Sequence, residues 1–344
     1  LALDNLQATA LVTFLPLGLL GGSLLFGPIV DRFGHKALLL LSCLVVLLGL
    51  EGIAFFTSIP LLQVSIIGIG LGGGILNGET NALVADISNE AEKGSRLSLL
   101  GAFYGIGALG IPVLLSFLSE YYSFEIILQG TGMVMLIGIL FCLGIRFPAP
   151  KQPQGFPIKE GLGLLKESSL LLLSFILFFQ SGIEGVCNNW TTLYLGQTTG
   201  IPENRALIAL TCMVAGLTVA RLLLVVLFKK IKQETVLRTS LITAVAGFAL
   251  LTFAPGFARA AIGMALIGAG LASTFPVILS IIGSRYASLS GTAFSVALVI
   301  ALIGQTLLNS LTGIISQGYG IVVYPYMMIV SLLIMLLLFK RSLK

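Results

Sequence analysis

Four polar side chains recur at helical spacing within a long apolar segment of the chain. They are Gln180, Glu184, Asn188 and Thr191, at positions i, i+4, i+8 and i+11. In an α-helix this spacing aligns them in one stripe. A charge in the middle of a bilayer costs about 2.5–3.5 kcal/mol, so we expect the stripe to avoid lipid and to line a water-filled cavity. Glu184 would bind a coupling proton there.

Side chains that suit a sugar lie beside this stripe. Trp190 and Tyr194 offer aromatic faces for the apolar side of a sugar ring, and the amides and hydroxyls supply donors and acceptors for its hydroxyl groups. Gln305 belongs to a second candidate stripe, with Asn309 and Thr312 at i+4 and i+7. The alternative for both stripes is that they only hold helices together, through hydrogen bonds worth about 0.6 kcal/mol each.

A second apolar segment also carries polar groups. Asn77 and Asn81 share one helix face and are candidate solute contacts, whereas Glu79 points to another face. Glu79 is a second candidate for the coupling-proton site. The alternative for Glu79 is a buried carboxylate paired with a basic group in a cytoplasmic gate. Arg221, inside a later segment, either pairs with a carboxylate such as Glu184 or has a structural role.

The composition of the chain fixes the class of protein. Of its 344 residues, 57% are hydrophobic and 10% are charged, and the mean hydropathy is +1.07. Soluble proteins carry about 25% charged residues, so a soluble fold is excluded, and the abundance of apolar side chains excludes disorder. The four cysteines all lie in apolar runs, which excludes a disulfide scaffold. The sequence therefore predicts a polytopic helical membrane protein.

Eleven apolar segments are long enough to cross a bilayer, which requires about 20 residues per helix. They are residues 6–30, 37–57, 61–85, 97–118, 125–145, 169–196, 206–228, 236–254, 258–282, 292–315 and 321–339.

The connections on one side of these segments hold most of the Lys and Arg residues. By the positive-inside rule that side, which includes the C-terminus, is cytoplasmic. Residues 147–168 are rich in Pro and Lys and are expected to be a cytoplasmic linker. This linker separates an N-terminal transmembrane bundle, residues 1–146, from a C-terminal one, residues 169–344. Five segments precede it and six follow, which predicts that a first helix is missing from this sequence.

A motif joins the first two apolar segments, between Gly27 and Lys36. It reads Gly-Pro-Ile-Val-Asp-Arg-Phe-Gly-His-Lys and resembles the G-x-x-x-D-R-x-G-R/K-R/K signature that the major facilitator superfamily carries between its second and third helices. The resemblance implies that the motif latches the outward-facing conformation, and that Asp86, at the inner end of the fourth helix, pairs with Arg32. The residues assigned to this latch are Gly27, Asp31, Arg32, Gly34 and Asp86.

Two further features bear on this motif. His35 lies in the predicted cytoplasmic loop and is not expected to relay protons. The corresponding loop in the second half, residues 228–232, reads Phe-Lys-Lys-Ile-Lys. It keeps the positive charge but has no acidic residue with which to build a second latch.

Shorter matches resemble the fucose-permease-like branch, the fucose/galactose/glucose:cation symporters. They include Gly-Ile-Glu ending at Glu184, Ala-Arg ending at Arg221 and Phe-Pro-Val-Ile starting at Phe275. The resemblance implies an all-α fold of two six-helix bundles with the solute bound between them. Tyr104 stands where the fucose pattern has an asparagine, so fucose is not the expected substrate. The candidate solute contacts are Asn77, Asn81, Tyr104, Gln180, Asn188, Trp190 and Gln305.

We therefore expect secondary active transport of a sugar or similar small polar solute across the cell membrane, by alternating access, with a proton rather than sodium as the coupling cation. The alternative is a proton-coupled antiporter that exports drugs or amphiphilic metabolites, which the glycines of the segment 97–118 and its Pro112 favour. The sequence has no nucleotide-binding, zinc-binding or cofactor motif, so we expect no cofactor, no enzymatic activity and no nucleic-acid binding.

Overall fold

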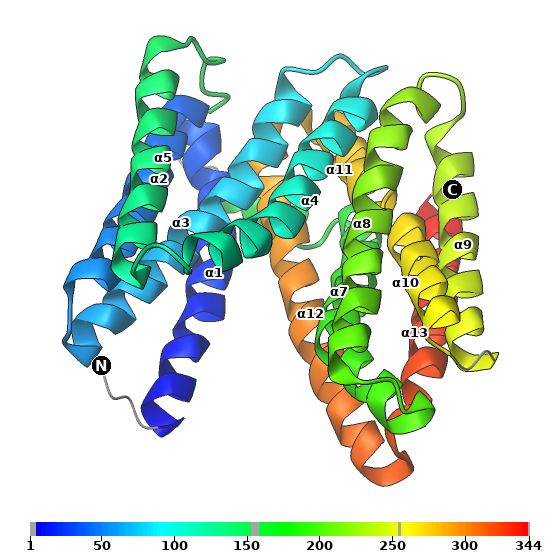
Figure 1. The fold of residues 1–344 in the computed structure, drawn as a ribbon. Coiled ribbons are helices and arrows are strands. Elements are labelled where there is room, and N and C mark those ends of the chain that lie inside the picture. The colour runs from blue at the N-terminus through cyan, green and yellow to red at the C-terminus, as the bar shows by residue number, and fades with distance from the viewer. Residues whose placement is uncertain (1–4, 153–157, 254–255, 343–344) are drawn as a thin grey trace. The chain divides into compact units, whose positions relative to one another are not determined.

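The computed structural model describes residues 5–152, 158–253 and 256–342, which form helices joined by short connections (Figure 1). The helices are α1 (Asn5–Phe33), α2 (His35–Phe55), α3 (Ile59–Asp86), α4 (Lys93–Leu118), α5 (Phe124–Gly144), α6 (Ile158–Leu164), α7 (Ser168–Thr199), α8 (Glu203–Leu227), α9 (Gln233–Phe253), α10 (Phe257–Leu271), α11 (Thr274–Arg285), α12 (Ser290–Tyr319) and α13 (Tyr324–Ser342). Short 3₁₀ turns at Ala287–Leu289 and Ile321–Val323 precede α12 and α13.

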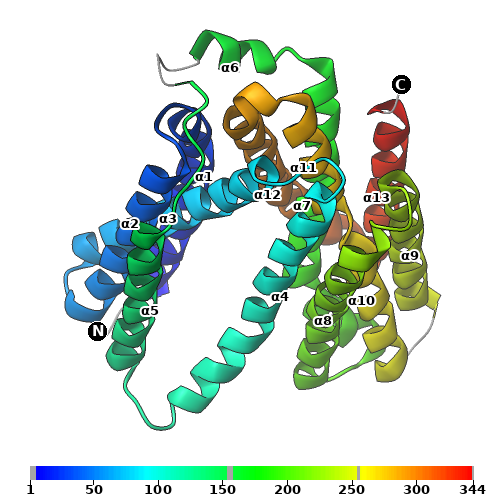
Figure 2. The ribbon, with the colours of Figure 1, turned by 90° about the horizontal axis from the view of Figure 1, so that it is seen from above.

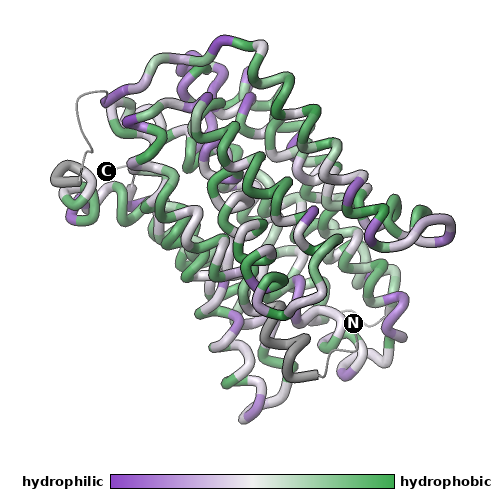
Figure 3. The backbone as a smooth tube through the Cα atoms, turned by 90° about the vertical axis from the view of Figure 1, so that its left-hand side faces the viewer, coloured by the Kyte–Doolittle hydropathy of each residue, from purple (hydrophilic) through white to green (hydrophobic). Residues whose placement is uncertain are grey.

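The predicted polytopic helical fold is confirmed. Within the described ranges, 11 helical segments are long and apolar enough to cross a membrane. Hydrophobic residues dominate these segments in Figure 3, and the most hydrophilic ones gather toward helix ends and connections. The predicted linker contains a short helix, α6, which is visible in Figure 2.

One predicted span, residues 258–282, is divided into two helices. The division falls between Leu271 and Thr274 and is explained by Pro276, the third residue of α11. Proline has no N–H to donate, and its ring clashes with the carbonyl four residues earlier, here that of Ala272. The span is therefore kinked at this point.

The described chain divides into two compact units. One consists of Leu1–Ile87, Ile111–Leu165 and Tyr286–Val299, and the other of Ser88–Gly110, Lys166–Arg285 and Ile300–Lys344. Two helices, α4 and α12, begin in one unit and end in the other. The division into bundles 1–146 and 169–344 stays a prediction.

Glycines bring the helices of the first unit close together. A Cβ atom built on Gly22 of α1 would lie 2.2 Å from the carbonyl oxygen of Leu71 in α3. One built on Gly78 of α3 would lie 2.2 Å from the ring of Phe26, which is completely buried. Small residues allow this close packing of membrane helices, which gains van der Waals contact where lipid offers no hydrophobic driving force.

The second unit uses the same device between α8 and α10. A Cβ atom on Gly268 would lie 1.9 Å from the carbonyl oxygen of Met213, and one on Gly216 would lie 2.3 Å from that of Ala265. On α13, the fully buried Tyr324 packs against α7. These contacts fix α7, which carries the predicted polar stripe, within its unit.

Candidate functional site

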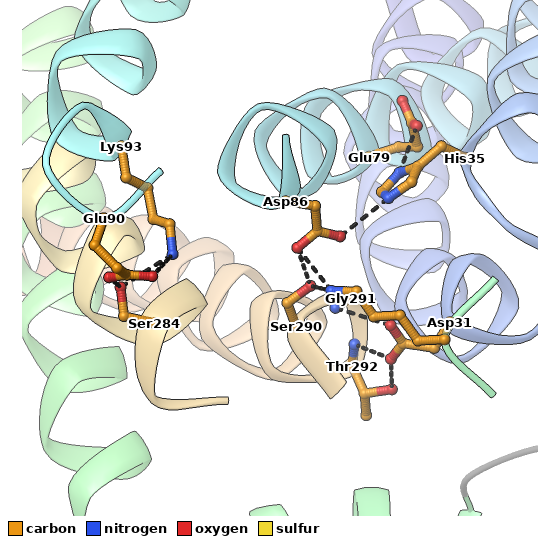
Figure 4. Close-up of polar contacts among 11 residues, drawn as sticks. Asp31, His35, Glu79, Asp86, Glu90, Lys93, Ser284, Ser290, Gly291 and Thr292 are labelled. Atoms are coloured by element: carbon orange, nitrogen blue, oxygen red, sulfur yellow. Dashed lines mark hydrogen bonds and ion pairs between the residues drawn. The ribbon is translucent and has the colours of Figure 1, made fainter. Parts of the chain in front are cut away.

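The N-terminus of α12 is held by a carboxylate from another helix. Asp31, in the last turn of α1 and almost fully buried, accepts hydrogen bonds from the amides of Gly291 (3.2 Å) and Thr292 (2.8 Å) and from the Thr292 hydroxyl (2.6 Å) (Figure 4). The first turn of α12 has no acidic residue of its own. The first N–H groups of a helix lack intrahelical partners and carry partial positive charge. Asp31 therefore supplies both the hydrogen-bond acceptors and the opposite charge.

Two glycines make this contact possible. A Cβ atom built on Gly27 would lie 2.5 Å from the carbonyl oxygen of Gly291, and one built on Gly291 would lie 2.3 Å from a methyl carbon of Val30. A third glycine, Gly34, links α1 to α2 with φ +80°, a conformation that L residues rarely adopt. Gly27 therefore sets the approach of α1 to α12, and Gly34 sets the turn that follows.

A histidine joins two acidic residues beside this contact. The Nδ1 atom of His35 lies 3.1 Å from Oε1 of Glu79, and its Nε2 atom lies 3.0 Å from Oδ2 of Asp86 (Figure 4). His35 is 4% exposed and Glu79 is 0% exposed. His35 is the first residue of α2, so it is part of a helix and not of a free loop. It occupies a position at which the family signature has Arg or Lys.

Lysine 151, which follows α5, completes the group. The ammonium of Lys151 donates to Oδ1 of Asp86 at 2.7 Å and also to the hydroxyl of Ser290, which itself donates to the same Asp86 oxygen at 2.9 Å. The amide of Gln152 donates to the backbone carbonyl of Asp31 at 2.8 Å. We refer to this group as the latch cluster; its members are Asp31, His35, Glu79, Asp86, Lys151, Ser290, Gly291 and Thr292.

The predicted latch residues thus gather in the first unit, with partners that the prediction missed, among them His35, Lys151 and the first residues of α12. His35 could have been found, because it occupies a basic position of the motif. Lys151 could not have been predicted, because the sequence of a Pro-rich connection does not show which helix its side chains contact. The guanidinium of Arg32 lies over the Phe33 ring at 5.2 Å, and its pairing with Asp86 stays a prediction.

The N-terminus of α4, in the second unit, carries a smaller polar cluster. The ammonium of Lys93 donates to Oε1 of Glu90 at 2.7 Å and to the hydroxyl of Ser284 at 3.1 Å, and that hydroxyl also bonds Glu90 (Figure 4). The hydrogen bond from Lys93, assisted by the one from Ser284, holds the pKa of Glu90 below its ordinary value. Lys93 is buried, whereas Glu90 is exposed.

The polar stripe of α7 is connected to the kink between α10 and α11. The amide of Gln180, which is fully buried, donates to Oε1 of Glu184 at 2.8 Å and to the carbonyl oxygen of Leu271 at 3.1 Å. Leu271 is the last residue of α10 and lies just before the kink. Gln180 therefore binds both the carboxylate of Glu184 and the carbonyl of Leu271 beside the kink.

The C-terminal half of the stripe makes different contacts. The side-chain amide of Asn188 donates to the backbone carbonyl of Glu184 at 2.9 Å and is exposed. Thr191 is buried and lies 3.0 Å from the hydroxyl of Tyr324. The Tyr194 hydroxyl donates to the carbonyl of Leu251 at 3.3 Å. Gln180, Glu184 and Asn188 are thus neighbours, whereas Thr191 and Tyr194 serve contacts with other helices.

Residues of α7 and α12 meet along one side of this stripe. The amide of Asn189 donates to the Asn309 carbonyl oxygen at 2.8 Å. A Cβ atom on Gly185 would lie 2.6 Å from the side chain of Gln305, and one on Gly313 would lie 3.4 Å from the ring of Trp190. Gln305 and Trp190 are therefore both placed where α7 packs on α12.

Of the remaining predicted residues, Arg221 interacts electrostatically with Glu184 of the stripe. Arg221 of α8 donates from Nη1 to the carbonyl of Gly101 in α4 at 3.0 Å. Tyr104, also on α4, is 74% exposed. In the first unit, the Asn81 amide donates to the Asn77 carbonyl at 2.7 Å, so these two share a face of α3 as expected.

Comparison with known proteins agrees with this architecture. A family model described as Major Facilitator Superfamily matches residues 1–307. The chain belongs to the major facilitator superfamily. Members of this superfamily are membrane transporters, so the fold places the chain among multi-pass transport proteins.

Individual superfamily members resemble the chain at low identity. The glucose/mannose transporter GlcP of Bacillus subtilis is 24% identical over 88% of this chain and 79% of its own length. The multidrug resistance protein MdtH of Aeromonas hydrophila is 30% identical over 47% of this chain and 39% of its own length. The crystal structure of the E. coli fucose:proton symporter FucP has a TM-score of 0.83 and 19% identity, covering 98% of this chain and 90% of that one. At that identity the likeness to FucP establishes the fold alone.

Proposed function

We propose that this superfamily member is a proton-coupled symporter that carries a sugar or a similar small polar solute by alternating access. The observation that carries the proposal is the arrangement around Glu184, an acidic residue in the interior of a membrane-spanning helix. Its carboxylate accepts a hydrogen bond from Gln180, and Asn188 lies one turn further along. An ionisable group can bind a coupling proton, and amides can pair with the hydroxyl groups of a solute.

The proton is assigned to Glu184 because of its surroundings. A charged carboxylate at this depth is costly, and protonation removes that cost. In its charged form Glu184 is stabilised by the Gln180 amide, which also holds the Leu271 carbonyl at the kink. A change in the charge of Glu184 therefore changes the strength of its hydrogen bond with Gln180, whose amide also binds the end of α10 beside the kink. Glu79, the second candidate, is bonded to His35 in the latch cluster.

Solute recognition is assigned to amide and aromatic side chains of both halves of the sequence. Amides pair with sugar hydroxyls as donors and acceptors, and Trp190 offers an aromatic face. The similarity to a glucose/mannose transporter supports a hexose as the solute, and that to a fucose:proton symporter supports the proton as the coupling ion. The proposed contacts are Asn77, Asn81, Tyr104, Gln180, Asn188, Trp190 and Gln305.

The orientation of the chain in the membrane is assigned from the positions of its Lys and Arg residues. The connections rich in Lys and Arg, together with the C-terminus and the linker 147–168, are assigned to the cytoplasm by the positive-inside rule. In this orientation the latch cluster and the Glu90–Lys93 cluster both lie at cytoplasmic helix ends. Substrate would reach its site alternately from the two sides of the membrane.

A proton-coupled exporter of amphiphilic compounds is the second candidate function. It is favoured by the 30% identity to a multidrug resistance protein. The glycines of α4 give it less support, because they have a packing role: a Cβ atom on Gly105 would lie 2.1 Å from the Thr218 hydroxyl, and one on Gly101 would lie 2.9 Å from the Arg221 guanidinium.

The proposal is tested with the purified chain in proteoliposomes and radiolabelled glucose, mannose, galactose and xylose. We expect an inward proton gradient to drive accumulation of at least one of these sugars. Glu184→Gln should abolish accumulation, because an amide cannot take up a proton, while leaving exchange of labelled for unlabelled sugar intact. Unchanged accumulation by this variant would remove Glu184 from the coupling role.

Glu51→Gln is the matched control. Glu51 is also a carboxylate within a membrane helix, but it lies against α5, where a Cβ atom on Gly132 would be 2.4 Å from its Oε1 atom. We expect this variant to accumulate sugar like the unmodified protein. If both variants lose accumulation equally, the loss reflects altered folding and not coupling.

A further inference from the structure

The latch cluster contains one group whose chemistry differs from the rest. Histidine is the side chain whose ordinary pKa lies within the range of cellular pH, so its charge changes where carboxylates stay ionised and lysines stay protonated. His35 stands at the centre of the cluster, with each ring nitrogen at hydrogen-bond distance from an acidic oxygen. The family signature has Arg or Lys there, whose charge would be permanent.

The number of protons in the cluster follows from these two contacts. A neutral imidazole has one N–H and one bare nitrogen. If the ring were neutral and both Glu79 and Asp86 were ionised, the bare nitrogen would face an oxygen lone pair at about 3 Å, with no proton between them. The observed contacts therefore need one additional proton, held on the ring or shared with Glu79.

The additional proton matters for stability because the groups that hold it are buried. Oε2 of Glu79 is buried and has no hydrogen-bond partner among the residues that the structure describes. Without the proton, Asp86 would keep its contacts with Lys151 and Ser290, whereas the buried Glu79 would lose the proton that its Oε1 atom shares with His35. A buried charge without a partner is strongly destabilising.

Other titratable and charged groups lie near His35. They comprise Asp31 and Arg32 on α1, Lys36 and Cys43 on α2, Glu79 and Asp86 on α3, Cys142 on α5, and Lys151 after it. Asp31 is occupied by the start of α12. The ammonium of Lys36 donates to the carbonyls of Leu143 and Ile145. The groups that face the cluster from the first turn of α12 are the hydroxyls of Ser290, which bonds Asp86, and Thr292, which bonds Asp31.

The cluster connects this proton to α12. Asp86 accepts bonds from His35, Lys151 and Ser290, and Ser290 is the first residue of α12. We propose that His35 and Glu79 form a proton-binding site that operates the latch: the start of α12 stays bound to α1 and α3 while the pair holds its extra proton, and it is released when that proton passes to water. This latch is independent of the solute and of the coupling residue proposed above.

The experiment measures the distance between the start of α12 and α2 as a function of pH. Spin labels are attached at Ala37→Cys and Ser288→Cys, two exposed positions, in full-length protein in lipid nanodiscs with Cys142 and Cys212 replaced by Ala. Double electron–electron resonance then gives the bound and released populations between pH 5.5 and 8.5. We expect the bound distance to dominate at low pH and the released-to-bound ratio to rise by up to about tenfold per pH unit, the limit for one proton.

Three variants separate this proposal from a general effect of pH. Glu79→Gln should stay bound across the range, because its amide can donate to a neutral His35 and no extra proton is needed. His35→Arg should also stay bound, since its charge is permanent. His35→Gln should be released throughout, because one amide cannot satisfy two carboxylates on opposite sides.

The proposal would be overturned if the bound and released populations of the protein with an unmodified latch cluster did not change with pH. This measurement requires no substitution within the latch cluster. The proposal would also be overturned if Glu79→Gln and His35→Arg kept the full pH dependence, because another group would then be titrating. Sugar transport is not part of the readout, so the latch and the proposed function fail separately.

Discussion

The N-termini of α12 and α4 are held in place by different chemistry. At α12 the buried carboxylate of Asp31, from the last turn of α1, binds two backbone amides. At α4 the Ser95 hydroxyl donates to the Val225 carbonyl at 3.2 Å, and the nearby connection, residues 228–232, supplies three lysines and no acid.

The difference shows what an acidic residue adds at such a contact. A carboxylate at a helix N-terminus is attracted by the partial positive charge there, whereas a lysine is not. The start of α12 therefore depends on charges that are buried, and on the histidine among them. The start of α4 depends on packing and on an ion pair whose acidic member is exposed, which is worth little in water.

The largest difference between the two sites should come from glycine substitutions. A Cβ atom on Gly27 would lie 2.5 Å from the Gly291 carbonyl oxygen, a backbone atom that cannot move alone. On Gly94 it would lie 2.6 Å from the side-chain amide of Gln233, which can rotate away. We expect Gly27→Ala to cost about 1–3 kcal/mol and Gly94→Ala less than about 0.5 kcal/mol, measured as shifts in the midpoint of thermal unfolding in detergent. Equal shifts would contradict the assignment of α12 as the tightly packed site.

Removing one negative charge at each site should have the next largest effect. Asp31→Asn leaves an acceptor but brings an NH₂ group toward the amides of α12, and we expect a cost of about 2 kcal/mol. Glu90→Gln changes an exposed group and should cost less than about 0.5 kcal/mol. The same unfolding measurement checks both variants. A loss with Glu90→Gln as large as that with Asp31→Asn would show that burial does not distinguish the two sites.

The smallest effect should be that of pH on the start of α4. Because the hydrogen bond from Lys93 holds the pKa of Glu90 below its ordinary value of 4.5, the stability it contributes is present above that value and is lost only as pH falls further. Between pH 5.5 and 8.5, spin labels at Ala91→Cys and Lys230→Cys, both exposed, should report one unchanging distance. A pH dependence matching that at α12 would mean that histidine is not what makes the latch cluster sensitive.

The sequence was sufficient to predict the helices and part of the latch cluster. Apolar runs of bilayer length located the membrane spans, and the motif pointed to Gly27, Asp31 and Gly34 because it is one continuous stretch of sequence. It did not show that Gly27 and Asp31 contact the start of α12. Asp86 came only from the resemblance. The division of a span at Pro276 could have been predicted from the missing N–H of proline.

The contacts that sequence could not predict join segments far apart in the chain. Lys151 reaches Asp86, and Gln180 reaches the carbonyl of Leu271, 91 residues away. Neither pairing has a periodicity or a spacing that points to it. The helical period placed Gln180 and Glu184 on one face of α7, but which neighbouring helix faces that stripe is decided by tertiary packing.

The most direct test of the proposed function follows protons during solute entry. Proteoliposomes containing the protein and a pH-sensitive dye inside are mixed with each sugar in turn, without an imposed gradient. A symporter should acidify the interior when its sugar enters, and Glu184→Gln should not. Acidification that persists in Glu184→Gln, or proton movement out of the vesicles driven by amphiphilic compounds and by none of the sugars, would contradict the account.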